Sequence, residues 1–241
     1  MRAETLVAFA QQLIKTESLS GREGEVARLV QQQMHALGYD EVLIDAYGSV
    51  IGVIRGQGEK TILFDAHMDT VPVPNPDEWH FPPFGAESVS DRIYGRGSAD
   101  MKGALAAMVM AAGALAREKH RLAGNIVVTA TTWEEFFEGY TLGKALDLLK
   151  TRSLYPSAVV IGEATHLAIA RGQRGRGEVL LKTYGKPAHA SQPQLGIHAV
   201  EKILPLLQHI LSLHPPQDPF LGEGILVLTD IISSPYPGAS V

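Results

Sequence analysis

Four clusters of acidic and histidine side chains follow strand-like stretches of this sequence, and their chemical types suit the binding of a divalent cation. The clusters contain His67 and Asp69, then Asp100, then Glu134 and Glu135, and finally Glu163. Carboxylates at the ends of buried strands are costly unless they are paired, and a divalent cation is a common partner. Imidazole and carboxylate donors suit zinc, manganese or cobalt, and a second carboxylate beside them could take a proton from water. The clusters therefore predict a metal-dependent hydrolytic site.

Each cluster also has an ordinary structural explanation when it is taken alone. Asp69 could cap a turn while His67 hydrogen-bonds the backbone. The glutamate pair could be a solvated helix face, Asp100 could be a helix N-cap, and Glu163 could simply end its strand. In open α/β sheets, however, ligands gather at the carboxyl ends of the strands. Four such clusters in one chain favour a single shared site.

The elements that must position these residues alternate between helix and strand. Apolar periodicity predicts helices over residues 3–15, 101–119 and 141–150, and a further helix that ends near Gly38. Ser20 and Glu23 have the spacing of a capping box at the start of that helix. Residues 41–44 and 50–54 predict an antiparallel pair. The apolar runs 61–64, 125–129 and 158–161 predict central strands covered on both faces, so we expect an α/β sheet.

The character of the sequence changes near the glycine-rich segment 172–177. The stretch beyond it predicts a strand over 178–184, a loop over 185–196, a helix over 197–213, a strand over 224–232 and a turn-rich segment over 234–241. A strand so close to the end of the chain would normally be paired or covered, so we expect a fragment. The expected domains are the first part of a metal-binding α/β domain over 1–172 and an incomplete domain over 173–241, with the remainder of both missing.

The composition argues against several other classes of protein. A net charge of −5 gives no sign of binding to nucleic acid or to an acidic membrane. The absence of cysteine excludes disulfides, thiolate zinc sites and cysteine nucleophiles, and it fits a reducing cytoplasm. The N-terminus lacks the pattern of a signal peptide. The apolar run Ala104–Ala116 is too short to span a bilayer and predicts a buried helix, so we expect a cytoplasmic protein.

The spelling and order of five segments resemble one family of enzymes. The segments are Asp65–Pro72, Tyr94–Gly103, Glu134–Glu135, Gly162–Thr165 and Gly185–Pro193. Together they resemble the acetylornithine deacetylase / succinyl-diaminopimelate desuccinylase / glutamate carboxypeptidase family of dinuclear zinc hydrolases, and the likeness runs across nearly the whole chain. The resemblance implies a zinc-peptidase-like α/β fold, with a mixed, mostly parallel sheet flanked by helices. It also implies an inserted α+β lid and dimerisation domain, truncated here.

The resemblance further implies a role for each metal ligand. His67 and Glu163 would hold one metal ion, and Asp100 would bridge two ions. Glu135 would hold the second ion. The cofactors would be two divalent ions, zinc in the first place, with cobalt or manganese as alternatives. The family's last ligand is a histidine beyond position 241, so the second ion would lack a ligand in this chain.

Three more residues receive roles from the same resemblance. Asp69 would orient His67 by a hydrogen bond to its far nitrogen. Glu134 would be the general base. His189, in the lid domain, would stabilise the oxyanion, in this family often from the partner subunit of a homodimer. Without the family segment around it, His189 would be interpreted as an ordinary histidine in a surface loop.

The preferred function is hydrolysis of the amide bond of a small N-acyl amino acid or short peptide, as in a deacetylase, desuccinylase or carboxypeptidase. The alternative is a catalytically inactive fragment or a non-catalytic homologue that binds a metal or ligand. A nucleotide-binding domain would rest on Gly95-Arg96-Gly97. That stretch lacks a third glycine and precedes Asp100, whose charge would repel a phosphate.

Overall fold

The computed structural model describes residues 3–233. These residues form two compact units, one that runs to Leu167 and one that begins at Ala168. The division lies just before the glycine-rich segment 172–177. The predicted turn-rich segment 234–241 lies outside the described residues.

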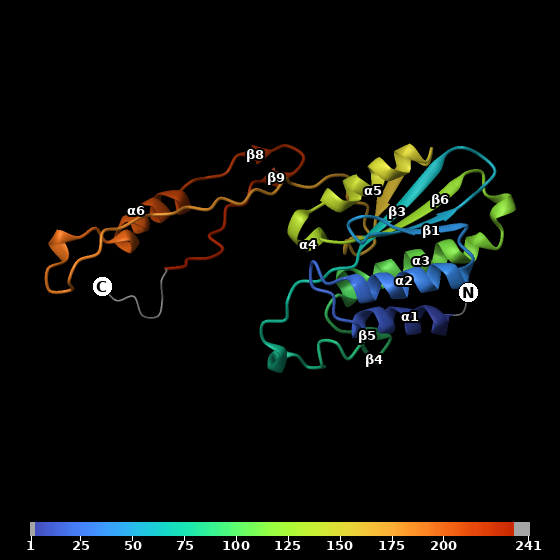
Figure 1. Ribbon diagram of the computed structural model, residues 1–241, viewed down its shortest axis with the longest axis horizontal. Helices are drawn as coiled ribbons and strands as arrows, with labels where there is room; N and C mark the ends of the chain where they lie inside the picture. The colour runs from blue at the N-terminus through green and yellow to red at the C-terminus, as the bar shows by residue number, and fades with distance from the viewer. Residues whose placement is uncertain (1–2, 234–241) are drawn as a thin grey trace. The chain divides into compact units, whose positions relative to one another are not determined.

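A five-stranded sheet forms the centre of the first unit, with the strand order β1-β2-β6-β3-β7 (Figure 1). The strands are β1 (Glu41–Ile44), β2 (Val50–Ile54), β3 (Thr61–His67), β6 (Asn125–Thr131) and β7 (Ala158–Ile161). β3 runs parallel to β6 and β7, whereas β2 is antiparallel to β1 and β6. The sheet is therefore mixed, as predicted, and the antiparallel pair of β1 and β2 is confirmed.

Helices cover both faces of this sheet (Figure 1). α2 (Gly24–Leu37) and α3 (Gly103–Ala116) pack on one face, and α1 (Ala3–Lys15) packs against α3. α5 (Tyr140–Thr151) packs on the other face, preceded by the single turn α4 (Glu134–Phe137). The remaining elements of the unit are the unpredicted hairpin of β4 (Glu87–Val89) and β5 (Arg92–Tyr94), an irregular segment at Ser98–Lys102, where Asp100 and Met101 have non-helical backbone angles, and short 3₁₀ turns at Pro76–Glu78 and Lys119–Arg121.

The apolar side chains form two cores, one on each side of the sheet. Val128 belongs to the larger core under α1, α2 and α3, while its neighbour Val127 belongs to the smaller core under α5. Successive side chains of a strand point to opposite faces, so a strand that feeds both cores must be apolar throughout. The prediction of strands covered on both faces is confirmed for β3 and β6.

α3 is the buried helix that the apolar run predicts. Within the described residues, Ser98–Ala116 is long and apolar enough to cross a membrane by length and composition alone. Its residues Leu105, Ala106, Val109 and Met110 are nevertheless buried in the larger core, against α1, α2, β3 and β6. The hydropathy of this stretch therefore reflects packing inside the first unit.

The prediction of a covered central strand is wrong for β7. Its three larger residues are substantially exposed, from 42% at Val160 to 54% at Ile161. In the described part of the chain β7 pairs only with β3, which makes it the edge of the sheet. A continuous apolar run reads the same in sequence whether or not a neighbour covers the strand.

The second unit contains α6 (Ala199–Leu211), the short hairpin of β8 (Gln217–Asp218) and β9 (Gly222–Glu223), and a 3₁₀ turn at Pro193–Leu195. The predicted helix over 197–213 is thus present. The predicted strands over 178–184 and 224–232 are wrong, because among residues 168–233 neither stretch pairs into a ladder. Val179 and Tyr184 are each 83% exposed. The hydrogen bonds of a strand come from a neighbour, which apolar and β-branched content alone cannot supply.

The capping box predicted at the start of α2 is also wrong. Glu23 occupies the N-cap position, but no side chain caps the helix there. The side chains of Ser20 and Glu23 instead bond to residues at the carboxyl edge of the sheet. The predicted end of the helix is correct, since Gly38 adopts the left-handed conformation (φ 83°) that glycine favours at a helix C-terminus.

Candidate metal centre

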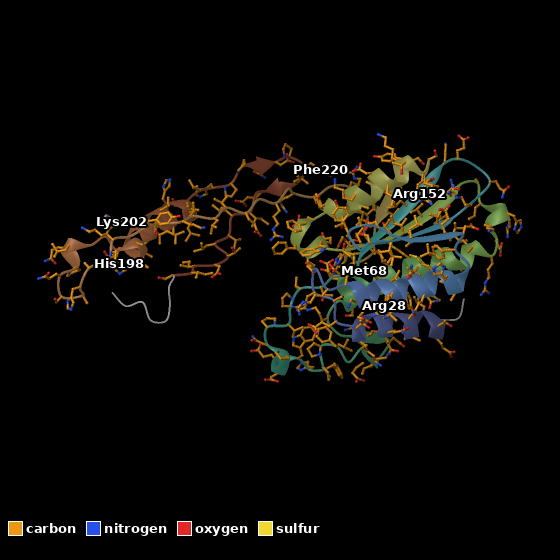
Figure 2. The ribbon with its side chains drawn as sticks, viewed as in Figure 1. Arg28, Met68, Arg152, His198, Lys202 and Phe220 are labelled. Atoms are coloured by element: carbon orange, nitrogen blue, oxygen red, sulfur yellow. The ribbon has the colours of Figure 1, made fainter. Side chains whose placement is uncertain are left out.

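The four predicted clusters meet at the carboxyl edge of the parallel strands. His67 is the last residue of β3 and pairs with Thr131 at the end of β6, and Glu163 follows the end of β7. Met68, labelled in Figure 2, marks this edge and is fully buried between His67 and Asp69. Parallel strands in register carry their following loops to the same place, which explains why residues so distant in sequence converge.

His67 lies at the centre of the cluster. Its Nε2 is 3.0 Å from Asp100 Oδ1, 3.8 Å from Glu163 Oε1 and 3.9 Å from Glu134 Oε2. The imidazole is 1% exposed, whereas the side chain of Asp100 is 57% exposed. The ring therefore forms the buried floor of the site, and the carboxylates lie between it and the solvent.

Two groups of side chains offer donor atoms that lie within 4.8 Å of one another. One contains His67, Asp100 and Glu135, and the other contains His67, Glu134 and Glu163. Both groups combine one imidazole nitrogen with carboxylate oxygens, which is a donor set that suits zinc, manganese or cobalt. Every predicted metal ligand belongs to one of them. Glu134 is also present, so this geometry does not separate the expected base from the expected ligand Glu135.

The tautomer of His67 follows from its other nitrogen. Nδ1 lies 2.9 Å from the backbone carbonyl oxygen of Asp69 and donates to it, so Nε2 is the nitrogen that faces the carboxylates and could bind a metal ion. The Asp69 carboxylate is farther away, at 3.5 Å from Nδ1. The main orienting contact is therefore the carbonyl of Asp69. The backbone hydrogen bond that would have been the ordinary explanation for His67 coexists with the metal-type cluster.

The carboxylate of Asp69 holds the glutamate pair. It is fully buried, and its Oδ1 accepts the backbone N–H of Glu134 at 3.1 Å. Its Oδ2 accepts the backbone N–H of Glu135 at 3.0 Å and the hydroxyl of Ser20 at 2.7 Å. Asp69 thus caps α4 as well as contributing to the orientation of His67, and it ties the loop after β3 to the loop after β6.

Asp100 reaches the site from an irregular segment rather than from a helix cap. The N-cap of α3 is Lys102, so the explanation of Asp100 as that cap is wrong. Lys102 is fully buried, and its Nζ donates to the backbone carbonyl of Thr16 at 2.6 Å. That bond anchors the segment that carries Asp100 to the end of α1.

The pKa values describe a site with too many carboxylates for its single imidazole. Burial raises the pKa of Glu134 to about 7; the charge of His67 opposes this shift, and the charges of Glu163 and Glu135 add to it. Burial also raises the pKa of Glu135 and of Glu163. Burial alone would lower the pKa of His67, but its contacts with Asp100 and Asp69 raise it to about 11. A divalent cation would supply the missing positive charge, so these residues fit such an ion.

Sequence reasoning missed the contribution of residues 20–23. Glu23 is 4% exposed, and its Oε1 accepts the backbone N–H groups of Gly21 and Trp133, each at 3.0 Å. The spacing of Ser20 and Glu23 was the only signal, and it points to a helix cap as readily as to a site. His189 lies in the second unit, where its Nδ1 is 2.8 Å from Ser191 Oγ, so the first unit alone does not supply it.

Comparison with known proteins gives a consistent result. The chain is 32% identical over 228 residues to the uncharacterized protein YgeY of Escherichia coli K12, covering 94% of this chain and 56% of that protein. It is 30% identical over 213 residues to a succinyl-diaminopimelate desuccinylase of Vesicomyosocius okutanii, covering 86% and 56% respectively. The fold is similar to that of the M20 family metallo-carboxypeptidase Sso-CP2 from Sulfolobus solfataricus (TM-score 0.64, 24% identity, 90% of this chain and 50% of that one).

The chain spans about half the length of the curated relatives it matches. The family model described as peptidase family M20/M25/M40 matches residues 63–215, a range that holds every predicted ligand from His67 to Glu163. The sequence, the fold and the matched range agree, and the chain belongs to peptidase family M20/M25/M40.

Proposed function

We propose that this protein is a metal-dependent hydrolase that cleaves the amide bond of a small N-acyl amino acid or short peptide. The observation that carries the proposal is the convergence on His67 Nε2 of Asp100, Glu163 and Glu134, at 3.0 to 3.9 Å. The names of two similar proteins, a desuccinylase and a metallo-carboxypeptidase, support the class of bond.

The proposed cofactors are two divalent ions, zinc in the first place, with cobalt or manganese as alternatives. His67 and Glu163 would hold one ion, Glu135 would hold the other, and Asp100, the carboxylate nearest to His67, would bridge them. Bound ions of this kind supply Lewis acidity, which makes water easier to deprotonate and an amide carbonyl easier to attack.

Glu134 is the proposed general base. Its Oε2 lies 3.9 Å from His67 Nε2, beside the candidate ligands, where a carboxylate can accept a proton from water and return it to the leaving amine. Asp69 accepts the backbone N–H of this glutamate and so fixes its position. The buried ring of His67 forms the floor of the site. His189 is proposed to stabilise the oxyanion of the tetrahedral intermediate, contributed from the partner subunit of a homodimer. We further propose a cytoplasmic protein with no nucleic-acid or membrane partner.

One observation favours a second candidate, a non-catalytic metal-binding homologue. Both candidate donor groups in the described residues share the single histidine His67. With Nδ1 donating to the Asp69 carbonyl, that ring has one lone pair left and can serve only one ion. A chain that held one ion without the other could bind metal and yet not turn over substrate.

The substitution Glu134→Gln separates the two candidates. In an enzyme it should lower turnover of a panel of N-acyl amino acids and dipeptides by about 10²–10⁴-fold while zinc content stays close to that of the wild type. Glu135→Gln should instead lower zinc content, and Glu25→Gln, on the exposed side of α2, should change neither. Zinc binding by the wild type with no hydrolysis of any panel member would favour the binding homologue. Unchanged turnover in Glu134→Gln would remove this residue from the role of base.

A further inference from the structure

The glutamate pair sits on a backbone turn that is held by two buried carboxylates. Three consecutive N–H groups donate outward from this turn. Trp133 donates to Glu23 Oε1 at 3.0 Å, Glu134 to Asp69 Oδ1 at 3.1 Å, and Glu135 to Asp69 Oδ2 at 3.0 Å. Asp69 belongs to the site already described, whereas Glu23 lies on a segment that carries no proposed ligand.

The turn needs such support because it cannot hold itself. α4 contains only the four residues Glu134–Phe137, far fewer than a helix requires to be stable alone. Trp133, which precedes it, has a φ of 60°, a left-handed conformation that costs free energy for a residue with a side chain. Contacts from outside the turn must therefore select this conformation.

Residues 20–23 supply these contacts. The ring of Trp133 lies against Gly21, where an added Cβ would come within 2.7 Å of it. The N–H of Gly21 donates to the same Glu23 oxygen that accepts from Trp133, and the Ser20 hydroxyl donates to Asp69. One short segment thus contacts both the carboxylate under α4 and the residue before it.

Glu23 is not occupied by its own helix. It stands at the N-cap of α2 but makes no side-chain cap bond there. Its carboxylate is buried, and the hydrogen bonds of its Oε1 go to Gly21 and Trp133. A buried carboxylate turned away from its own helix toward the glutamate turn has a local role at that turn.

We propose that Glu23 is a positioning residue for the Glu134–Glu135 pair. By accepting the N–H of Trp133 it fixes the direction in which α4 starts, and so the place from which both glutamate side chains reach the site. The catalytic consequence rests on the proposed function, whereas the effect on backbone order and on metal affinity does not.

Three substitutions at Glu23 test this. Glu23→Met has similar length but accepts no hydrogen bond. Glu23→Gln keeps an acceptor for both N–H groups, since both bonds go to the single oxygen Oε1. Glu23→Asp keeps the charge but is one methylene too short to reach. Glu25→Met makes the same replacement on the same helix at a side chain that is 65% exposed, and it serves as the matched control.

The measurements are zinc affinity by competition with a chromophoric chelator, amide hydrogen exchange at residues 132–136, and kcat and KM for an N-acyl amino acid. Glu23→Met should exchange faster at these amides and bind zinc about tenfold more weakly. Its kcat should fall about 10- to 100-fold with KM little changed, because the reacting groups are misplaced while substrate contacts remain. Glu23→Gln should restore most of each value, and Glu25→Met should match the wild type.

Zinc affinity, local exchange and kcat all within twofold of the wild type in a folded Glu23→Met would overturn the proposal. If Glu23→Met does not fold, the contrast between the other two variants decides: impairment of Glu23→Asp alone supports positioning, and equal behaviour of Glu23→Asp and Glu23→Gln overturns it. A wild type without hydrolytic activity would refute the proposed function. The zinc and exchange measurements would still test Glu23 in that case.

Discussion

Replacement of Asp69 by asparagine is the most stringent test of how the loop after β6 is held. Both oxygens of this buried carboxylate are acceptors, Oδ1 from Glu134 and Oδ2 from Glu135 and Ser20. An asparagine has one acceptor oxygen and one amide nitrogen that only donates. In either orientation of the amide, one of the two glutamate N–H groups therefore faces a donor and loses its partner.

The size of the effect follows from these contacts. A buried N–H left without a partner costs about 1–3 kcal/mol, and the bond that remains loses the added strength of a charged acceptor, about 1 kcal/mol. Burial opposes ionisation of Asp69, yet contacts with His67, Ser20 and Glu135 hold its pKa below the ordinary range, so the native group is a carboxylate. We expect Asp69→Asn to lower the free energy of unfolding by about 2–4 kcal/mol. Zinc affinity should fall by about 10- to 100-fold.

Asp45 provides a matched control for the same chemical change. Its Oδ1 accepts both Tyr47 N–H and Ser49 N–H, at 2.8 and 2.9 Å, while its Oδ2 has no hydrogen-bond partner. An asparagine can place its oxygen at Oδ1 and keep both bonds, so Asp45→Asn should cost less than about 1 kcal/mol. Urea unfolding in the presence of a chelator measures both variants without a contribution from metal. Equal losses of stability in the two variants would refute the reasoning.

Other regions of the first unit give further predictions. The Tyr39 hydroxyl donates to the backbone carbonyl of Val109 at 2.9 Å, and burial raises its pKa. The stabilisation that this hydroxyl contributes is therefore complete below its pKa in the unfolded chain, near 10, and is lost as the pH rises above that value. Tyr39→Phe should lower the free energy of unfolding at pH 8 by about 1 kcal/mol and should make that free energy fall less steeply between pH 9 and 11. Urea titrations at each pH measure both effects, and an unchanged dependence of the free energy on pH would contradict this prediction. Gly113→Ala should destabilise by about 1–3 kcal/mol because the new Cβ would lie 2.6 Å from α2, whereas Gly143→Ala, with open space around it in α5, should stabilise by up to about 1 kcal/mol. Opposite shifts of the urea midpoint check this pair. Zinc at a hundred times its dissociation constant should raise the free energy of unfolding by about 2.7 kcal/mol relative to a sample with chelator, as measured in thermal melts. An equal stabilisation by zinc of the His67→Ala variant would exclude the site described here.

The elements and residues that sequence predicts well are those with local signals. The bounds of β1 and β2 follow from apolar runs on either side of a turn at Tyr47 and Gly48, and the structure has both strands where they were expected. The clusters around His67, Asp100 and Glu163 were identifiable because each stands just beyond an apolar run or in a distinctive motif. The meeting of His67 and Glu163 follows from a general property of parallel strands, whereas Asp100 reaches them from the irregular segment before α3.

The features that sequence did not predict depend on partners far away in the chain. Ser20 and Glu23 have the spacing of a helix cap, but their partners lie 49 and 110 residues away, at Asp69 and Trp133. Nothing in the local pattern distinguishes these destinations. The exposure of β7 and the unpaired stretches of the second unit have the same cause, since apolar content predicts that a strand can form but not what lies beside it.

The uninterrupted register of β3 with β6 restricts how the chain can change in length. Residues from Thr61 to His67 pair one for one with Asn125 to Thr131. An insertion of one residue inside β3 would turn His67 to the opposite face, and one inside β6 would turn Thr131 and displace the glutamate pair that follows it. The exposed turn at Lys119–Arg121 lies at the other end of β6, and additions there shift no candidate ligand. Engineered insertions such as affinity tags or reporter peptides therefore belong at that turn, while the stretch from Thr61 to Asp69 tolerates substitutions only at constant length.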